Sequence, residues 1–147
     1  MAATMDRPHA VAPGRWHAGR WHAFLLAAAV PLFLGALLSD WAYWTSYEIQ
    51  WSNFASWLVA GGMVFLGIAL VCALVDVFRA ERRGGRALVH FALLLVAFVL
   101  GLINALVHAR DAWAVMPSGI VLSVVVLLLV AVATAMAFAG LRTGERP

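Results

Sequence analysis

The stretch ALVHFALLLVAFVLGLINALVH, residues 87–108, decides the fold class of this chain. Two histidines and one asparagine are its only polar side chains. A helix that crosses the hydrocarbon core of a bilayer needs about 20 predominantly apolar residues, and this run has that length and composition. A helix is the expected form because lipid offers no hydrogen-bond partner to the backbone. The stretch therefore predicts a transmembrane helix.

Three other runs have the same character. The predicted helices cover about 23–43, 55–78, 87–108 and 114–141, and the first contains Pro31. Apolar residues make up 65% of the 147 residues and charged residues 12%, whereas soluble domains have about 45–50% and 25%. Because the connections are short, neighbouring helices should be antiparallel. The sequence predicts an all-α membrane four-helix bundle.

Short tails flank the predicted transmembrane domain at residues 21–141. Residues 1–20 contain Pro8, Pro13 and two glycines but no apolar core, so we expect a disordered tail and no signal peptide. Residues 142–147 form the second tail. The single cysteine, Cys72, excludes a disulfide framework within the chain and a cysteine-rich metal site. No metal site is predicted.

The arginines predict the orientation of the bundle. Only Arg110 falls in a connection on one side of the predicted membrane. The other nine fall in the tails and the second connection: Arg7, Arg15, Arg20, Arg79, Arg82, Arg83, Arg86, Arg142 and Arg146. The positive-inside rule then places both termini in the cytoplasm. Because the arginines do not share one continuous face, the net charge of +3 does not indicate nucleic-acid binding.

Aromatic residues concentrate in the first connection. Ser39–Trp57 holds four tryptophans and two tyrosines. Such rings form belts at membrane–water interfaces. Their density here also suits a folded, Trp-rich cap over the outer end of the bundle.

Polar residues recur at one spacing in two of the predicted helices. His90 and His108 lie eighteen positions apart, as do His22 and Asp40. At 3.6 residues per turn this spacing returns to the same helix face, and Asn104 lies one turn before His108 on that face. Because the first and third helices run in the same direction, we expect His22 level with His90 and Asp40 level with His108.

Two polar clusters follow as hypotheses, since ionisable residues inside a membrane are functional candidates. The inner cluster contains His22, Asp76 and His90. The outer cluster contains Asp40, Asn53, Asn104, His108 and Asp111.

Plainer interpretations of the same residues stay open. His22 and His90 would then face lipid headgroups, and Asn104 with His108 would supply hydrogen bonds between helices. Asp76 would pair with Arg79, and Asp40 with Arg110.

Three segments resemble the bacterial membrane family called domain of unknown function 2231. They are HAFLLAAAVPLFLGALLSDWAY at 22–43, WSNFASWLVAGG at 51–62 and INALVHARDAWAVMPSG at 103–119. The resemblance implies a four-helix bundle in the bacterial inner membrane and no settled activity. Some members of the family are joined to Rieske-type iron–sulfur domains, which implies a redox association.

Three functions remain as alternatives. The sequence has no zinc motif of the His-Glu-x-x-His type, no Gly-rich phosphate loop and no Gly-x-Ser-x-Gly elbow. The favoured hypothesis is therefore a non-catalytic membrane subunit or scaffold, embedded in the lipid bilayer, whose Trp-rich cap binds a periplasmic or membrane protein. The second is a b-type haem or quinone-linked electron carrier with His22 and His90 as the haem pair. The third is a small solute or proton-linked transporter using Asp40, Asn104 and His108, for which a homo-oligomer would supply the pore.

Overall fold

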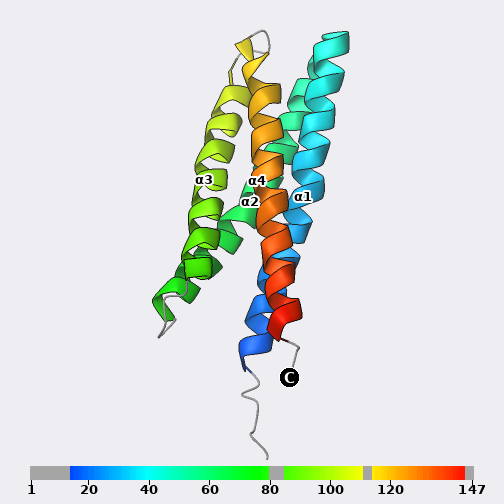
Figure 1. Cartoon of the computed structure of the whole chain (residues 1–147). Coiled ribbons are helices and arrows are strands. Elements are labelled where there is room, and N and C mark those ends of the chain that lie inside the picture. Colours follow the sequence, from blue (N-terminus) through cyan, green and yellow to red (C-terminus); the bar gives the residue numbers. More distant parts are fainter. Residues whose placement is uncertain (1–13, 80–84, 111–113, 145–147) are drawn as a thin grey trace, which may run out of the picture.

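Four long helices make up the protein (Figure 1). The computed structural model describes residues 14–79, 85–110 and 114–144. The helices are α1 (Gly14–Ser46), α2 (Ile49–Arg79), α3 (Gly85–His108) and α4 (Ser118–Gly144), and the described residues contain no strand. Each helix includes a segment long and apolar enough to cross a membrane. The predicted all-α membrane bundle is confirmed.

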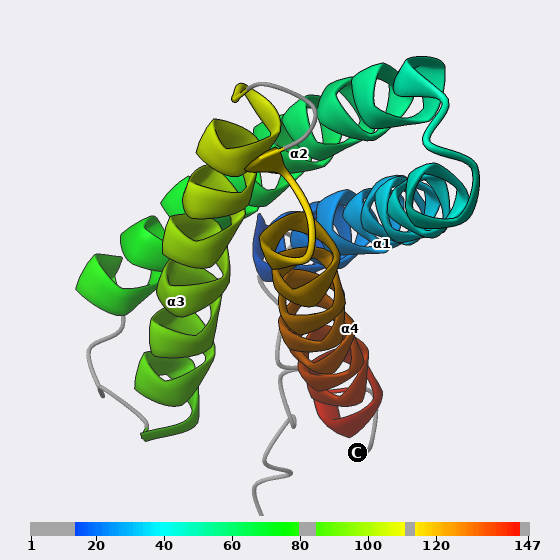
Figure 2. The ribbon, with the colours of Figure 1, turned by 90° about the horizontal axis from the view of Figure 1, so that it is seen from above.

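The helices form a ring in which each one packs against two neighbours. The contacting pairs are α1 with α2, α2 with α3, α3 with α4, and α4 with α1 (Figures 1 and 2). Consecutive helices run in opposite directions, so α1 and α3 are parallel and face each other diagonally across the ring. We call the end that holds Gly14 and Gly144 the basal end, and the end that holds the α1–α2 connection the apical end.

The core of the bundle contains a close contact between the backbone of Gly62 on α2 and the ring of Phe33 on α1. Phe33 of α1 is fully buried, and a Cβ atom placed on Gly62 of α2 would lie 2.9 Å from its ring. Small residues let helix backbones approach in lipid, where packing rather than water exclusion holds helices together. Leu26, Leu66 and Leu94 belong to the same buried core. The bundle is tight at mid-height.

Large apolar side chains cover the outside of the bundle. Phe24, Val64, Leu102 and Leu128 are all exposed, one on each helix. Soluble monomers rarely expose continuous apolar surfaces of this extent. Lipid is the medium that suits such an exterior.

The connection between α1 and α2 is shorter than predicted. The helices end and begin at Ser46 and Ile49, so most of the Trp-rich segment is helical. Tyr47 has φ 57°, in the left-handed region, and its N–H donates to the carbonyl of Tyr43 at 2.8 Å, which closes α1. The predicted cap is therefore made of two helix ends rather than a separate folded connection. Continued helix keeps the backbone hydrogen-bonded at the membrane surface.

Other helix bounds also differ from the predicted ones. α1 begins at Gly14, so part of the predicted tail 1–20 is helical, while residues 1–13 and 145–147 lie outside the described residues. α4 begins at Ser118, directly after Pro117, rather than near 114. Pro31 lies inside α1 without ending it, because neighbouring helices and local adjustment tolerate proline in membrane helices.

Candidate functional site

A buried polar network joins three helices near the apical end. The Asp40 Oδ1 atom on α1 lies 2.7 Å from the His108 Nε2 atom on α3. Ser123 of α4 donates its hydroxyl to Asp40 Oδ2 at 2.5 Å, and the Asn104 amide donates to Ser123 Oγ at 3.0 Å. All four residues are buried. We call Asp40, Asn104, His108 and Ser123 the apical network.

The hydrogen-bond partners of His108 fix its tautomer. Its Nδ1 atom lies 2.9 Å from the backbone carbonyl oxygen of Asn104, which only accepts, so Nδ1 carries a hydrogen. One proton then lies between Nε2 and the Asp40 carboxyl, on either partner. The pair is an imidazolium with a carboxylate, or a neutral imidazole with a carboxylic acid. Both forms have zero net charge, which limits the cost of placing them within the membrane.

Glycine on α4 makes room for the imidazole ring. A Cβ atom on Gly119 would lie 3.2 Å from His108 Cε1 and 2.7 Å from a methyl group of Val115. On α1, the Ser39 hydroxyl donates to the carbonyl of Gly35 in its own helix at 2.8 Å. Ser39 therefore leaves the Asp40 carboxyl to its partners on α3 and α4.

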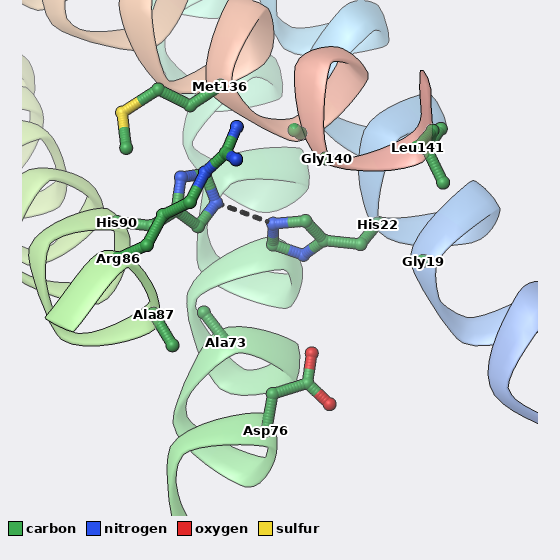
Figure 3. A pocket seen from close by; sticks show the side chains of 11 residues that line it. Gly19, His22, Ala73, Asp76, Arg86, Ala87, His90, Met136, Gly140 and Leu141 are labelled. Atoms are coloured by element: carbon green, nitrogen blue, oxygen red, sulfur yellow. Dashed lines mark hydrogen bonds between the residues drawn. The ribbon is translucent and has the colours of Figure 1, made fainter. Parts of the chain in front are cut away.

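A pair of histidines joins α1 to α3 near the basal end (Figure 3). The Nε2 atoms of His22 and His90 lie 2.9 Å apart, and the rings meet at 68°. One Nε2 must carry a hydrogen and the other must accept it. His22 is only 8% exposed, and its Nδ1 atom is buried without a hydrogen-bond partner in the described part of the chain. Figure 3 shows this atom turned away from His90, towards the side where Asp76 lies.

A cavity of about 500 Å³ adjoins the histidine pair, and we call it the basal cavity. This volume is within the range of small-molecule sites, about 300–1,000 Å³. All four helices contribute to its wall, which consists of Gly19, His22, Ala73, Asp76, Arg86, Ala87, His90, Met136, Ala137, Gly140 and Leu141 (Figure 3). Five of these eleven residues are glycine or alanine, so the ends of the helices leave space between them.

The structure brings together most of the residues that the sequence singled out. His22 meets His90, and Asp40 meets His108 beside Asn104. Asp76 lines the basal cavity. The Asp40 carboxyl is bound by His108 and Ser123, whereas Arg110 is exposed.

Other predicted residues lie elsewhere. Asn53 is exposed on α2 and is not among the buried residues of the apical network, whereas the neighbouring Ser52, Ala55 and Val59 form the buried face of that helix. Asp111 and the side chain of Arg79 lie outside the described residues. Within the described ranges, no three His, Cys, Asp or Glu side chains are grouped to hold a metal ion.

Ser123 is the network residue that sequence reasoning missed. It contacts both Asp40 and Asn104. It is the only polar residue between Ile120 and Ala133. A lone hydroxyl within an apolar span was the available signal, because such groups often bond across helices in membranes.

The fold and the polar contacts together define a four-helix membrane protein. Its parallel helices α1 and α3 are linked by one side-chain contact near the basal end and another near the apical end. Residues 20–140 match the family model described as predicted membrane protein (DUF2231), and the chain belongs to this family. No curated protein and no solved structure matches the chain. The predicted family resemblance is confirmed.

Proposed function

We propose that this chain is a non-catalytic subunit or scaffold of the bacterial inner membrane. The observation that carries the proposal is that the acid and base groups of the apical network are bound within the bundle, although the side-chain oxygen of Asn104 has no partner among the described residues. Both carboxyl oxygens of Asp40 and both ring nitrogens of His108 have partners within the bundle. A general acid or base needs a position that faces the proton it transfers. These groups instead join α1, α3 and α4.

The apolar core favours a scaffold over a transporter. Leu26, Phe33 and Leu94 are fully buried and lie between the two polar ends. The eighteen residues from His22 to Asp40 span about 27 Å of helix at 1.5 Å per residue. A solute or proton would have to cross this distance through close-packed apolar side chains.

Charge distribution supports cytoplasmic termini. The start of α1, the end of α2, the start of α3 and the end of α4 all lie at the basal end. The arginine-rich parts of the sequence flank these positions, and among the described residues only Arg110, two positions after the end of α3, follows a helix end at the apical side. The positive-inside rule then assigns the basal end to the cytoplasm and the apical end to the periplasm.

Exposed tryptophans at the apical end mark the proposed partner surface. Trp41 on α1 is 62% exposed and Trp57 on α2 is 78% exposed. Trp44 and Trp51 add further exposed rings beside the α1–α2 connection. Aromatic side chains are enriched in protein interfaces and at bilayer surfaces. A membrane or periplasmic protein is the proposed occupant.

Photocrosslinking in living cells tests the partner surface. A photoreactive amino acid replaces Trp41 or Trp57. In the control variants the same amino acid replaces Leu102 or Leu128, which are exposed on α3 and α4. We expect both apical positions to yield an adduct with the same second polypeptide and the controls to yield none. Adducts with lipid alone at every position would contradict the proposal. Adducts with a second copy of this chain would replace the partner by a homo-oligomer.

The geometry of the histidine pair does not favour haem between the rings. A metal–imidazole bond is about 2 Å long, so two imidazoles on opposite faces of a haem iron need nitrogens about 4 Å apart. The two Nε2 atoms lie 2.9 Å apart and bond to each other. Of the electron-transfer alternatives, a ligand beside the pair suits this arrangement better than a metal within it.

A further inference from the structure

We propose that the basal cavity binds the neutral, oxygen-bearing ring of a lipid-soluble molecule, the chemical class of the quinones, with His22 as the hydrogen-bonding residue. The cavity lies at the opposite end of the bundle from the proposed partner surface. Ligand binding in the basal cavity and partner binding at the apical end are therefore separate properties, and either can be absent without the other.

The unpartnered nitrogen of His22 is the first support. Its Nδ1 atom is buried and has no partner among the described residues, and His22 lines the cavity. A buried polar atom without a hydrogen bond is unfavourable, because it has given up its bonds to water. An oxygen atom in the cavity would remove that cost.

The histidine pair adapts to either form of such a ring. If His90 donates the hydrogen in the Nε2–Nε2 contact, His22 carries its own hydrogen on Nδ1 and donates to a carbonyl oxygen. If His22 donates instead, its Nδ1 is bare and accepts from a hydroxyl. Quinones carry carbonyl oxygens and their reduced forms carry hydroxyls. The two tautomers of the pair therefore match the two forms of the ring. Changing between them moves the shared hydrogen from His90 to His22, removes the hydrogen from His22 Nδ1 and places one on His90 Nδ1.

The cavity wall suits an apolar body with a neutral head. Seven of the eleven lining residues are Gly, Ala, Met or Leu. The charged lining residues are one acid, Asp76, and one base, Arg86, so their charges offset. For an anionic phosphate, attraction to Arg86 would be offset by repulsion from Asp76, and the apolar remainder of the wall offers few donors. A neutral ring meets neither difficulty.

The depth of the cavity fits a ring whose tail lies in the bilayer. His90 is in the second turn of α3, and His22 lies three residues past the start of the first candidate span, at Gly19. These positions correspond to the boundary between headgroups and hydrocarbon, where rings with one polar edge prefer to lie.

Filling the cavity without touching the histidines gives the sharpest test. Gly140 lines the cavity, and a Cβ atom there meets nothing within 4 Å. Gly140→Leu should therefore fold while occupying the site. Ala139→Leu is the matched control, since Ala139 is the exposed neighbour and is not part of the wall. His22→Leu removes the hydrogen-bonding nitrogen.

The measurement is calorimetric titration of the detergent-purified full chain with decyl-benzoquinone, with decanol as the control for the alkyl chain. We expect saturable binding by the wild type and Ala139→Leu, at least tenfold weaker binding by His22→Leu and Gly140→Leu, and no saturable binding of decanol. Three results would overturn the proposal. They are wild-type affinity for decyl-benzoquinone in Gly140→Leu, decanol binding as tight as that of decyl-benzoquinone, and no binding of decyl-benzoquinone by the wild type. Saturable binding of short-chain phosphatidylglycerol in place of the quinone would also overturn it, by assigning the cavity to a lipid phosphate.

Discussion

His108 Nε2 lies 2.7 Å from Asp40 Oδ1, and 68 positions separate the two residues, the same separation as between His22 and His90. Both pairs connect α1 to α3 across the diagonal of the ring. Eighteen residues complete five helical turns, so the pairs face the same way at the two ends of the helices. Together they hold α1 and α3 in one register.

Removing the Asp40 side chain should destabilise the bundle far more than removing its charge. Asp40→Asn keeps the network, because the amide can donate to a neutral His108 and accept from Ser123. Its expected cost is below about 1 kcal/mol. Asp40→Ala leaves the Nε2 atom of His108 and the hydroxyl hydrogen of Ser123 buried without a partner, at a cost of about 3 kcal/mol. The measurement is the free energy of unfolding in mixed detergent micelles; equal losses in the two variants would argue against the network.

Two hydroxyls of α4 should differ in their contribution to stability. Ser123→Ala removes two contacts between helices and should cost about 1–2 kcal/mol. Thr134→Ala is the control, because within the described part of the chain the Thr134 hydroxyl donates only to the carbonyl of Val130 in its own helix. Its loss should stay below about 0.5 kcal/mol. The same unfolding assay compares them, and a neutral Ser123→Ala would contradict the interhelical role.

Adjacent glycines of α2 should respond in opposite ways to alanine. In Gly62→Ala the new methyl group would lie 2.9 Å from the buried Phe33 ring, and we expect a loss of about 1–3 kcal/mol. In Gly61→Ala the nearest atom is a methyl group of Leu32 at 3.6 Å, an ordinary contact. Alanine favours helix over glycine by up to about 1 kcal/mol, so this variant should be neutral or more stable. If Gly61→Ala proved the more damaging change, the α1–α2 packing described above would be wrong.

Cysteine labelling should decide the orientation. In a Cys72→Ala background, Ser46→Cys places a thiol at the apical end and Gly85→Cys places one at the basal end, both at exposed positions. With cytoplasmic termini, a membrane-impermeant maleimide applied to spheroplasts should label Ser46→Cys at once and Gly85→Cys only after lysis. The reverse pattern would invert the assigned topology.

The sequence by itself determined the four membrane helices and the levels of their polar residues. Lipid demands long apolar runs, and the helix repeat places His90, Asn104 and His108 on one face whatever surrounds them. Alternating direction then makes the first and third helices parallel, which puts His22 level with His90. These conclusions need only local geometry and the thickness of the bilayer.

Only the tertiary structure decided which side chains meet. The repeat fixes directions within one helix but not the rotation of that helix against its neighbours. Packing sets this rotation: Phe33 lies against Gly62, which directs the Asp40 face of α1 to the interior. The same packing brings Ser123 to Asp40 and leaves Asn53 outside. The basal cavity likewise arises from small residues on four separate helices, which no single stretch of sequence reveals.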